Sequence, residues 1–382
     1  MVACGVLAAC LAGCLFSCRK EEGVIPPTHI DTGGSMQTDS IRGFFLLNEG
    51  NKGSNKATLD YFDYATGVYS KNIYPSRNPT VVKELGDVGN DIQIYGSKLY
   101  AVINCSHLVE VMDAATARHI ATIAIPNCRY ITFDKGYAYV SSYAGPVLID
   151  PGARLGYVAK VDTATLQVLD SCVVGYQPEE LVVCGNKLYV ANSGGYRVPD
   201  YDNTVSVVDL TTFAEVGKIV VGINLHRMRL DAYGYLWVSS RGDYKYTPSK
   251  TYVLDTRTDR VKTVFAQLPN SAMSLAGDSL YVLSSVWSEL SGSYSTAYAV
   301  VDVRTQRIVA QRFITDGTEP FIERPYGIAV NPETREILVA DAKDYVTPGV
   351  LYCFRPDGKK RWEASTGDIP SSIVFTRQRL AP

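Results

Sequence analysis

The chain has 382 residues, of which 46% are hydrophobic and 20% are charged, and its formal net charge is -2. This composition fits a globular protein with a large core and excludes a disordered chain, a collagen-like fibre and a small disulfide-rich protein. Non-specific binding of nucleic acid needs a surplus of basic residues, which this balance does not supply. The counts of 26 Tyr and 31 Gly against 4 His favour β-structure with many turns and leave little material for a histidine metal centre.

An apolar segment at residues 2–16 is typical of an export signal, because it is too short and too interrupted for a membrane span. Cys10, Cys14 and Cys18 each follow a plausible lipoprotein cleavage context, and the context of Cys14 fits the generic pattern best. Only Cys18 is followed at once by charge, Arg-Lys-Glu-Glu at residues 19–22, which resembles the surface-export signal of Bacteroidetes lipoproteins. We expect Cys18 to be acylated and to anchor the protein in a membrane. Acylation of Cys10 or Cys14, and an ordinary secretory signal, stay open as alternatives.

The chain is therefore divided into a lipoprotein signal peptide at residues 1–17, an acylated N-terminus with a flexible tether at residues 18–40, and a folded body at residues 41–382. The tether is predicted from a Pro-Pro pair, a Gly-Gly pair and several Ser, Thr and Asp residues, a composition that does not bury a core.

The folded body repeats one unit, in which a β-rich run ends in Asp and Thr follows three residues later. The first copy ends at Asp63 and Thr66, and the later Asp positions follow at intervals of 50, 49, 47, 46 and 47 residues. Asp and Thr side chains bond nearby backbone N–H groups, so the motif predicts a turn between two strands. A degenerate seventh copy surrounds Asp357. The intermediate Asp residues are Asp113, Asp162, Asp209, Asp255 and Asp302.

Each unit has room for four strands. In the fourth unit, runs rich in aromatic and β-branched residues predict strands at residues 178–183, 187–191, 205–209 and 215–221. Four strands in 45–50 residues are typical of a propeller blade. Seven units therefore predict an all-β, seven-bladed β-propeller.

The first unit lacks an inner strand of its own, because it starts with its second strand at residues 44–47. The C-terminal run at residues 369–375 has the character of the other inner strands, such as residues 129–133. We expect this run to pair into the first blade and close the ring, which removes the open sheet edges that attract other chains.

Two sets of loops should surround one mouth of the central channel: those joining the second and third strands of each blade, and those leading into each inner strand. Both sets are rich in Asn, Tyr and Arg. Aromatic rings supply flat apolar area and amide and guanidinium groups supply hydrogen bonds, so the pattern favours a ligand-binding rim. The candidate ligand-binding residues are Asn48, Glu49, Asn51, Asn90, Asn104, His107, Arg129, Tyr130, Tyr143, Gln177, Asn192, Tyr196, Arg197, His226, Arg227, Arg241, Tyr244, Trp287, Tyr326 and Tyr345.

The sequence contains no nucleophile elbow, no His-Glu-x-x-His motif and no phosphate-binding loop. Of the four His, only His107 and His226 fall in the mouth loops. We therefore expect no catalytic residues, no cofactor and no resident metal. A disulfide between Cys105 and Cys128, on neighbouring blades at the same mouth, stays open.

Five stretches of the mouth loops, at residues 47–51, 88–92, 103–107, 191–196 and 224–228, resemble those of the YncE-type propeller lipoproteins of Bacteroidetes, and more narrowly the BtuG-type cobalamin-binding surface lipoproteins. The resemblance extends from about Ile41 to the C-terminus. It implies a lipid-anchored propeller on the outer membrane that faces the cell exterior. It further implies capture of cobalamin or cobinamide as a transported ligand, delivery to a TonB-dependent outer-membrane transporter, and no catalysis.

The residues of the mouth loops fit such a ligand. A corrin is edged with amide side chains, which need hydrogen-bonding partners, and cobalamin carries an aromatic base, which needs a ring to stack on. Two other functions stay open. One is a scaffold that binds a protein or a glycan with the mouth. The other is a metal-dependent, lactonase-like hydrolase with a cation held by mouth carboxylates, for which the candidates are Glu49, Glu179, Asp243, Asp341 and Asp344.

Overall fold

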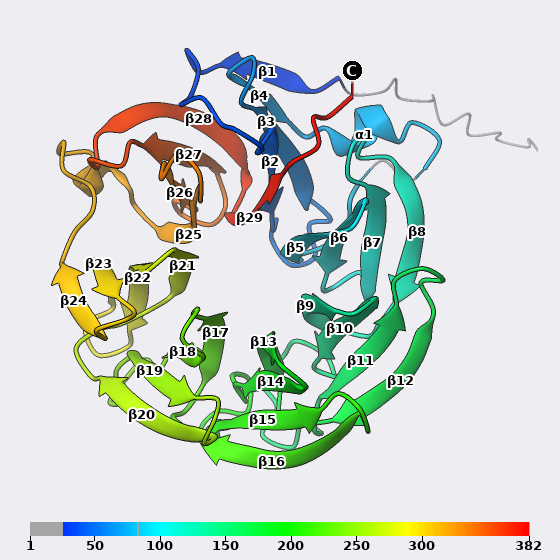
Figure 1. Cartoon of the computed structure of the whole chain (residues 1–382), viewed down its shortest axis with the longest axis vertical. Coiled ribbons are helices and arrows are strands. Elements are labelled where there is room, and N and C mark those ends of the chain that lie inside the picture. Colours follow the sequence, from blue (N-terminus) through cyan, green and yellow to red (C-terminus); the bar gives the residue numbers. More distant parts are fainter. Residues whose placement is uncertain (1–25, 82–83, 382) are drawn as a thin grey trace, which may run out of the picture.

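The computed structural model describes residues 26–81 and 84–381, and in this part of the chain it shows seven antiparallel sheets arranged around a central channel (Figure 1). Six sheets have four strands, and the first blade has five in the order β1-β4-β3-β2-β29. The predicted seven-bladed β-propeller is therefore confirmed.

The predicted four-stranded unit is also confirmed, since the fourth blade consists of β13 (Pro178–Cys184), β14 (Lys187–Asn192), β15 (Thr204–Asp209) and β16 (Ala214–Val220). The first blade contains β1 (Thr28–Asp31), β2 (Gly43–Asn48), β3 (Thr58–Asp63), β4 (Val68–Lys71) and β29 (Pro370–Thr376). The second and third contain β5 (Gly89–Tyr95), β6 (Lys98–Ile103), β7 (Leu108–Asp113), β8 (His119–Ala124), β9 (Cys128–Asp134), β10 (Tyr137–Ser142), β11 (Tyr157–Asp162) and β12 (Val168–Val173). The fifth and sixth contain β17 (Leu225–Leu230), β18 (Tyr235–Ser240), β19 (Lys250–Asp255), β20 (Arg260–Phe265), β21 (Ala272–Ala276), β22 (Ser279–Ser288), β23 (Ser293–Asp302) and β24 (Arg307–Ala310). The seventh contains β25 (Pro325–Val330), β26 (Ile337–Asp341), β27 (Pro348–Phe354) and β28 (Lys360–Asp368), and two short helices are α1 (Tyr74–Arg77) and η1 (Glu319–Phe321).

The core lies between neighbouring blades. Alternate side chains of a strand point to opposite faces of its sheet, and each face is covered by the next blade, so the middle strands are apolar on both faces. The rings of Phe44 and Phe62 in the first blade stack with centroids 5.1 Å apart. Phe62 stacks in turn on Trp362 of the seventh blade at 5.0 Å. Aromatic packing thus joins the two ends of the ring.

The C-terminal strand closes the ring as predicted. β29 pairs antiparallel with β2, from Gly43 opposite Thr376 to Asn48 opposite Pro370. On its other side, the backbone of β29 approaches β25 so closely that a Cβ atom on Gly327 would lie 2.1 Å from the carbonyl oxygen of Ser371. Glycine is required at this contact between the first and last blades.

The Asp-x-x-Thr motif closes turns between the outer two strands of the blades, as expected. In the third blade, Asp162 Oδ1 accepts hydrogen bonds from the backbone N–H groups of Ala164 and Thr165, at 2.8 and 2.7 Å. Asp209 does the same for Thr211 and Thr212 in the fourth blade. The motif is structural because its carboxylate satisfies the N–H groups of its own turn.

The folded body begins before Ile41, which corrects the predicted extent of the tether. Residues Thr28–Asp31 form β1 on the outer edge of β4. Ser40 then donates to Glu333 and Ser35 donates to Glu336, both in a turn of the seventh blade. β4 is only four residues long and leaves an edge that β1 covers, so a segment of polar composition is ordered by pairing and not by burial.

The signal peptide and Cys10, Cys14 and Cys18 lie outside the described residues. Within the described ranges, no helix has the length and apolar character needed to cross a membrane.

Candidate ligand-binding mouth

The two predicted sets of loops meet at one end of the channel, and backbone hydrogen bonds join them in six of the seven blades. In each case the residue directly after the second strand donates its N–H to the carbonyl of the residue directly before the inner strand of the same blade. Asn104 donates to Val88 at 2.8 Å, and Arg241 donates to Asn224 at 2.9 Å. The other donor–acceptor pairs are Glu49 to Ile369, Tyr143 to Asn127, Ser193 to Gln177 and Ala342 to Arg324. We call this end of the channel the mouth.

Several of these acceptor residues have a left-handed backbone. Val88 has φ of 60° and Ile369 has φ of 56°, which are unfavourable values for β-branched residues. Asn127, Gln177 and Asn224 have φ between 44° and 55°. The same conformation occurs at turns between outer strands, as at Leu166 and Phe213, so it is a repeated feature of the blades that the surrounding structure enforces.

The inner strands begin with a β-bulge in the same six blades, because the pairing register shifts there. A bulge changes the direction of the side chains that it carries. The residues within these shifts include many of the polar and charged groups of the mouth, namely Asn90, Arg129, Tyr130, Glu179, Glu180, His226, Arg227, Tyr326 and Ser371.

An ion network joins three neighbouring blades, the third, fourth and fifth, at the mouth. Glu179 is fully buried and its Oε2 accepts hydrogen bonds from Arg129 at 3.0 and 3.2 Å. Its Oε1 accepts from Arg241 at 3.0 Å and from the Tyr143 hydroxyl at 2.6 Å. Burial alone would raise the pKa of Glu179, but the two guanidinium groups and the hydroxyl lower it to about 2. Glu179 is therefore ionised at neutral pH.

A second network lies beside it. Glu180 accepts from Arg227 at 2.9 Å and from Arg229 at 2.7 Å. His226 Nε2 lies 2.9 Å from the Tyr130 hydroxyl. Burial lowers the pKa of His226 well below its ordinary value, and the nearby arginines lower it further, so the imidazole is neutral.

Glu49 has the opposite state from Glu179. Its side chain is buried and accepts a hydrogen bond from the Tyr326 hydroxyl at 3.1 Å. Burial raises the pKa of Glu49 to about 7, although Arg227 and Arg129 act to lower it. A large part of the Glu49 population is therefore protonated near neutral pH and can donate a hydrogen bond.

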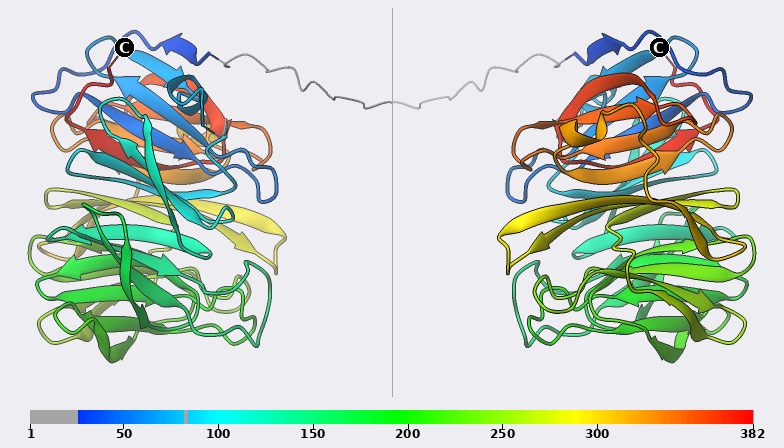
Figure 2. Two further views of the ribbon diagram at one scale, coloured as in Figure 1. Left: turned by 90° about the vertical axis from the view of Figure 1, so that its right-hand side faces the viewer. Right: turned by 90° about the vertical axis from the view of Figure 1, so that its left-hand side faces the viewer.

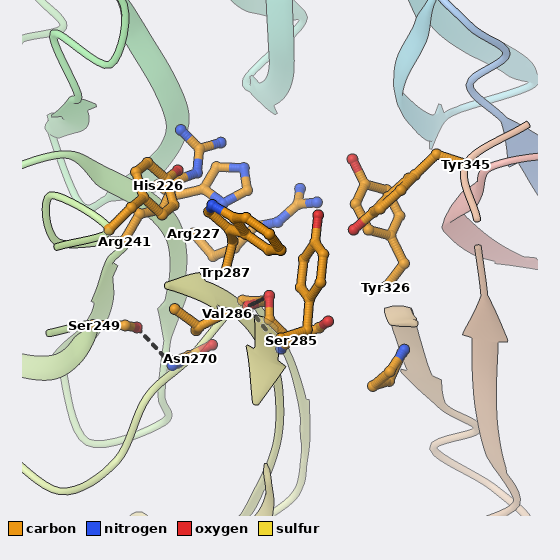
Figure 3. A pocket seen from close by; sticks show the side chains of 14 residues that line it. His226, Arg227, Arg241, Ser249, Asn270, Ser285, Val286, Trp287, Tyr326 and Tyr345 are labelled. Atoms are coloured by element: carbon orange, nitrogen blue, oxygen red, sulfur yellow. Dashed lines mark hydrogen bonds between the residues drawn. The ribbon is translucent and has the colours of Figure 1, made fainter. Parts of the chain in front are cut away.

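A cavity of about 460 Å³, which we call the bowl, lies between Glu49, Asn90, Arg129, Glu179, Tyr196 and Asn224. A second cavity of about 230 Å³, which we call the side pocket, lies between Trp287, Tyr294, Tyr326, Tyr345, Asn270 and Ser285. Figure 3 shows His226 of the fifth blade, Trp287 of the sixth, and Tyr326 and Tyr345 of the seventh reaching into the side pocket.

The side pocket depends on a long hairpin. β22 and β23 each have ten residues and remain paired as far as Ser288 opposite Ser293. Figure 2 shows this hairpin in yellow, reaching beyond the neighbouring blades at one end of the ring. Trp287 and Tyr294 lie on its extension with ring centroids 5.0 Å apart.

The structure brings most of the candidate residues together at these two cavities. Five candidates do not line them. The side chains of Asn48 and Asn192 are buried and hydrogen-bonded within their own blades, and Gln177 accepts from the N–H of Tyr196. His107 is exposed and Arg197 donates to its own loop. The candidates that line a cavity are Glu49, Asn51, Asn90, Asn104, Arg129, Tyr130, Tyr143, Tyr196, His226, Arg227, Arg241, Tyr244, Trp287, Tyr326 and Tyr345.

The sequence-based selection missed Tyr294, Asn270, Ser285 and Ser249 of the side pocket. Asn270 lies in a loop that leads into an inner strand, so its position already placed it at the mouth. Tyr294 was missed because the aromatic run at residues 294–300 looks like an ordinary third strand. The long interval between the predicted second and third strands of this unit could have indicated that its hairpin extends beyond the others and carries Tyr294 to the mouth.

The five carboxylates considered for a cation site do not form one cluster, since only Glu49 and Glu179 line the bowl. Asp341 accepts from the N–H groups of Arg324 and Lys343, and Asp243 and Asp344 accept from N–H groups of their own turns. No three His, Cys, Asp or Glu side chains in the described part of the chain are arranged as metal ligands.

Cys105 and Cys128 are both free thiols, so the disulfide left open by the sequence is not formed. Cys128 is buried and directs its Sγ at backbone carbonyl groups, one of them that of Leu108 at 3.2 Å.

Comparison with known proteins agrees with the fold. A quinonprotein alcohol dehydrogenase-like protein from Bacteroides thetaiotaomicron is 14% identical, over 89% of this chain and 80% of that chain, with a TM-score of 0.60. Hydrazine synthase from Kuenenia stuttgartiensis is 15% identical, over 70% of this chain and 77% of that chain, with a TM-score of 0.56. None of the curated proteins matches the sequence. Residues 42–354 match the family described as a domain of unknown function, DUF5074, and the chain belongs to this family.

Proposed function

We propose that the mouth binds a corrinoid, such as cobalamin or cobinamide, without chemically changing it. The observation that carries this proposal is the gathering of amide, guanidinium and aromatic side chains around two adjoining cavities. A corrin is edged with amide groups that both donate and accept hydrogen bonds. Asn51, Asn90, Asn104 and Asn224 line the bowl. Asn51, Asn90 and Asn224 each use one end of the amide in a hydrogen bond within the protein and leave the other end for a ligand.

Rigidity of the mouth supports tight binding. The loop-to-strand hydrogen bonds, the bulges and the buried pair of Arg129 and Glu179 hold the lining side chains in place before a ligand arrives. Little conformational entropy is then lost on binding, so more of the contact energy appears as affinity.

The proposal includes a lipid anchor at Cys18 and an outer-membrane location facing the cell exterior, with delivery of the ligand to a TonB-dependent transporter. Exposed apolar side chains on the mouth loops support docking of a partner protein. Ile149, Tyr246, Leu290 and Val346 are 63–75% exposed, and each belongs to the loop between the second and third strands of a different blade. A group of such side chains around a binding site is typical of an interaction surface.

Isothermal titration of the purified protein with cyanocobalamin tests the ligand. We expect one site with a dissociation constant well below micromolar. Arg129→Ala should weaken binding strongly, whereas Phe321→Ala, at an exposed position outside both cavities, should not. Absence of binding by the folded wild-type protein at micromolar concentration would refute the corrinoid proposal.

The same apolar loop tips favour a second candidate, a scaffold that docks another protein with its mouth. Capture of an outer-membrane transporter by a protein that binds no corrinoid would favour this candidate.

Mass spectrometry of the full chain produced in a Gram-negative host tests the anchor, since Cys18→Ala should abolish acylation whereas Cys10→Ala and Cys14→Ala should not.

A further inference from the structure

The bowl and the side pocket are connected but chemically different. They share four lining residues, His226, Arg241, Tyr244 and Tyr326. Beside its tyrosines the bowl has four asparagines and five charged residues, whereas the side pocket has Trp287 and four tyrosines with a single asparagine. A ligand that fills both cavities must therefore combine a large polar-edged part with a separate aromatic part.

The side pocket is shaped for a flat ring. Its aromatic walls are continuous, since the centroid of Tyr345 lies 6.4 Å from that of Tyr294 and 5.8 Å from that of Tyr326. Arg324 stacks on Tyr294 with 3.8 Å between its guanidinium carbon and the ring centroid, which fixes the position of this wall. Trp287 is 37% exposed and offers the largest ring face of the pocket.

Buried polar atoms in the side pocket have no partners among the described residues. These atoms are Asn270 Oδ1, Ser285 Oγ and His226 Nδ1. Asn270 is 1% exposed and His226 is 8% exposed. A buried polar atom without a hydrogen bond is costly, so the pocket wall holds polar groups that the surrounding protein does not saturate and that only a small shift of these side chains would turn toward a ligand.

Positive charge is concentrated where the two cavities meet. Glu179 and Glu180 are together contacted by four guanidinium groups, those of Arg129, Arg241, Arg227 and Arg229. Arg241 lines both cavities, and the buried Nε of Arg227 has no hydrogen-bond partner in the described chain. The junction thus offers guanidinium donors to an anionic group, and guanidinium is well suited to phosphate.

We propose that the side pocket and the junction arginines form a nucleotide subsite, in which a ligand's aromatic base lies against Trp287 and its phosphate lies at Arg227 and Arg241. The inference rests on the proposed function, because it assigns the base and phosphate of a complete corrinoid to this subsite and the corrin to the bowl. The protein then distinguishes corrinoids that carry a nucleotide from those that lack one.

Titration of wild type and Trp287→Ala with cobalamin and with cobinamide, which lacks the nucleotide, tests this subsite. We expect wild type to prefer cobalamin at least tenfold. Loss of a base–aromatic stack costs about tenfold or more in affinity, so Trp287→Ala should weaken cobalamin by that factor and leave cobinamide unchanged. Phe321→Ala is the matched control and should preserve both affinities.

Two results would overturn the subsite: equal affinity of wild type for the two corrinoids, or an equal loss for both in Trp287→Ala. If neither corrinoid binds, the proposed function fails, and the subsite is tested alone with free α-ribazole phosphate by ligand-observed NMR. Binding of this nucleotide that is lost in Trp287→Ala would support the subsite, whereas no binding by wild type would overturn it.

Discussion

Replacement of Glu179 by Gln should destabilise the propeller by about 3 kcal/mol at neutral pH. The carboxylate is buried between Arg129 and Arg241, and its pKa is lowered from 4.5 to about 2. A difference of one pKa unit corresponds to about 1.4 kcal/mol, so the ionised form contributes about 3 kcal/mol to folding. The substitution preserves the shape of the side chain but leaves two buried guanidinium groups without their counter-ion, a change that typically costs about 3–5 kcal/mol.

The pH dependence of this effect follows from its sign. A lowered pKa contributes stability that is fully present above the ordinary pKa of 4.5 and is lost as pH falls toward 2. The deficit of Glu179→Gln relative to wild type should therefore be constant between about pH 5 and pH 8.

Glu49 supplies the matched control, because it is a second buried carboxyl of the mouth with its pKa raised from 4.5 to about 7. The unfolded chain releases this proton near pH 4.5 and the folded chain keeps it to about pH 7, so wild type loses stability as pH rises between these values. Glu49→Gln removes that loss. The variant should be more stable than wild type by about 3 kcal/mol at pH 8 and by less than about 1 kcal/mol at pH 5.

Urea unfolding followed by tryptophan fluorescence measures both effects, since Trp237 and Trp362 are buried and report on the core. Unchanged dependence of the unfolding free energy on urea would show that the variants unfold to comparable states. A Glu179→Gln variant as stable as wild type at pH 7, or a Glu49→Gln variant destabilised to the same degree, would refute the assignment of opposite charge states.

Three further predictions concern the scaffold. Removal of residues 366–382 deletes β29 and opens the ring, so the product should not fold; a soluble fragment with a cooperative thermal transition would contradict this. Gly327→Ala places a methyl group against the Ser371 backbone and should cost about 1–3 kcal/mol in urea unfolding, whereas Gly217→Ala, with open space around it, should be neutral. The five described cysteines are free, so peptide mapping of the non-reduced, denatured protein should find all five alkylated by iodoacetamide.

The fold was largely predictable because its determinants are local and repeated. The turn formed by Asp162 and Thr165 needs only residues within three positions of each other. Closure was predictable because the first unit lacks an inner strand and residues 369–375 supply one. The order of Thr28–Asp31 was not predictable from composition, since it depends on the free edge of a short strand.

The sequence predicted which loops surround the mouth, but it did not predict which of their side chains line the cavities. Asn192 lies at the start of a mouth loop, yet its amide donates to Thr204 and Ser206 of its own blade and does not face a cavity. Tyr326 and Arg227 reach the cavities because bulges change the direction of their side chains, and a bulge leaves no clear mark in one sequence. Loop position therefore identifies candidates, and only the pairing register selects among them.

Stability and binding are coupled in this arrangement. The network around Glu179 connects inner strands β9 and β13 with Arg241, which follows β18, so three blades share one buried charge. Of its two guanidinium groups, Arg241 lines both the bowl and the side pocket, whereas Arg129 lines the bowl. A ligand phosphate at Arg241 would add a second anion to the network and relieve its excess of positive charge. The surplus of guanidinium over carboxylate groups in this network is thus the feature that favours an anionic ligand.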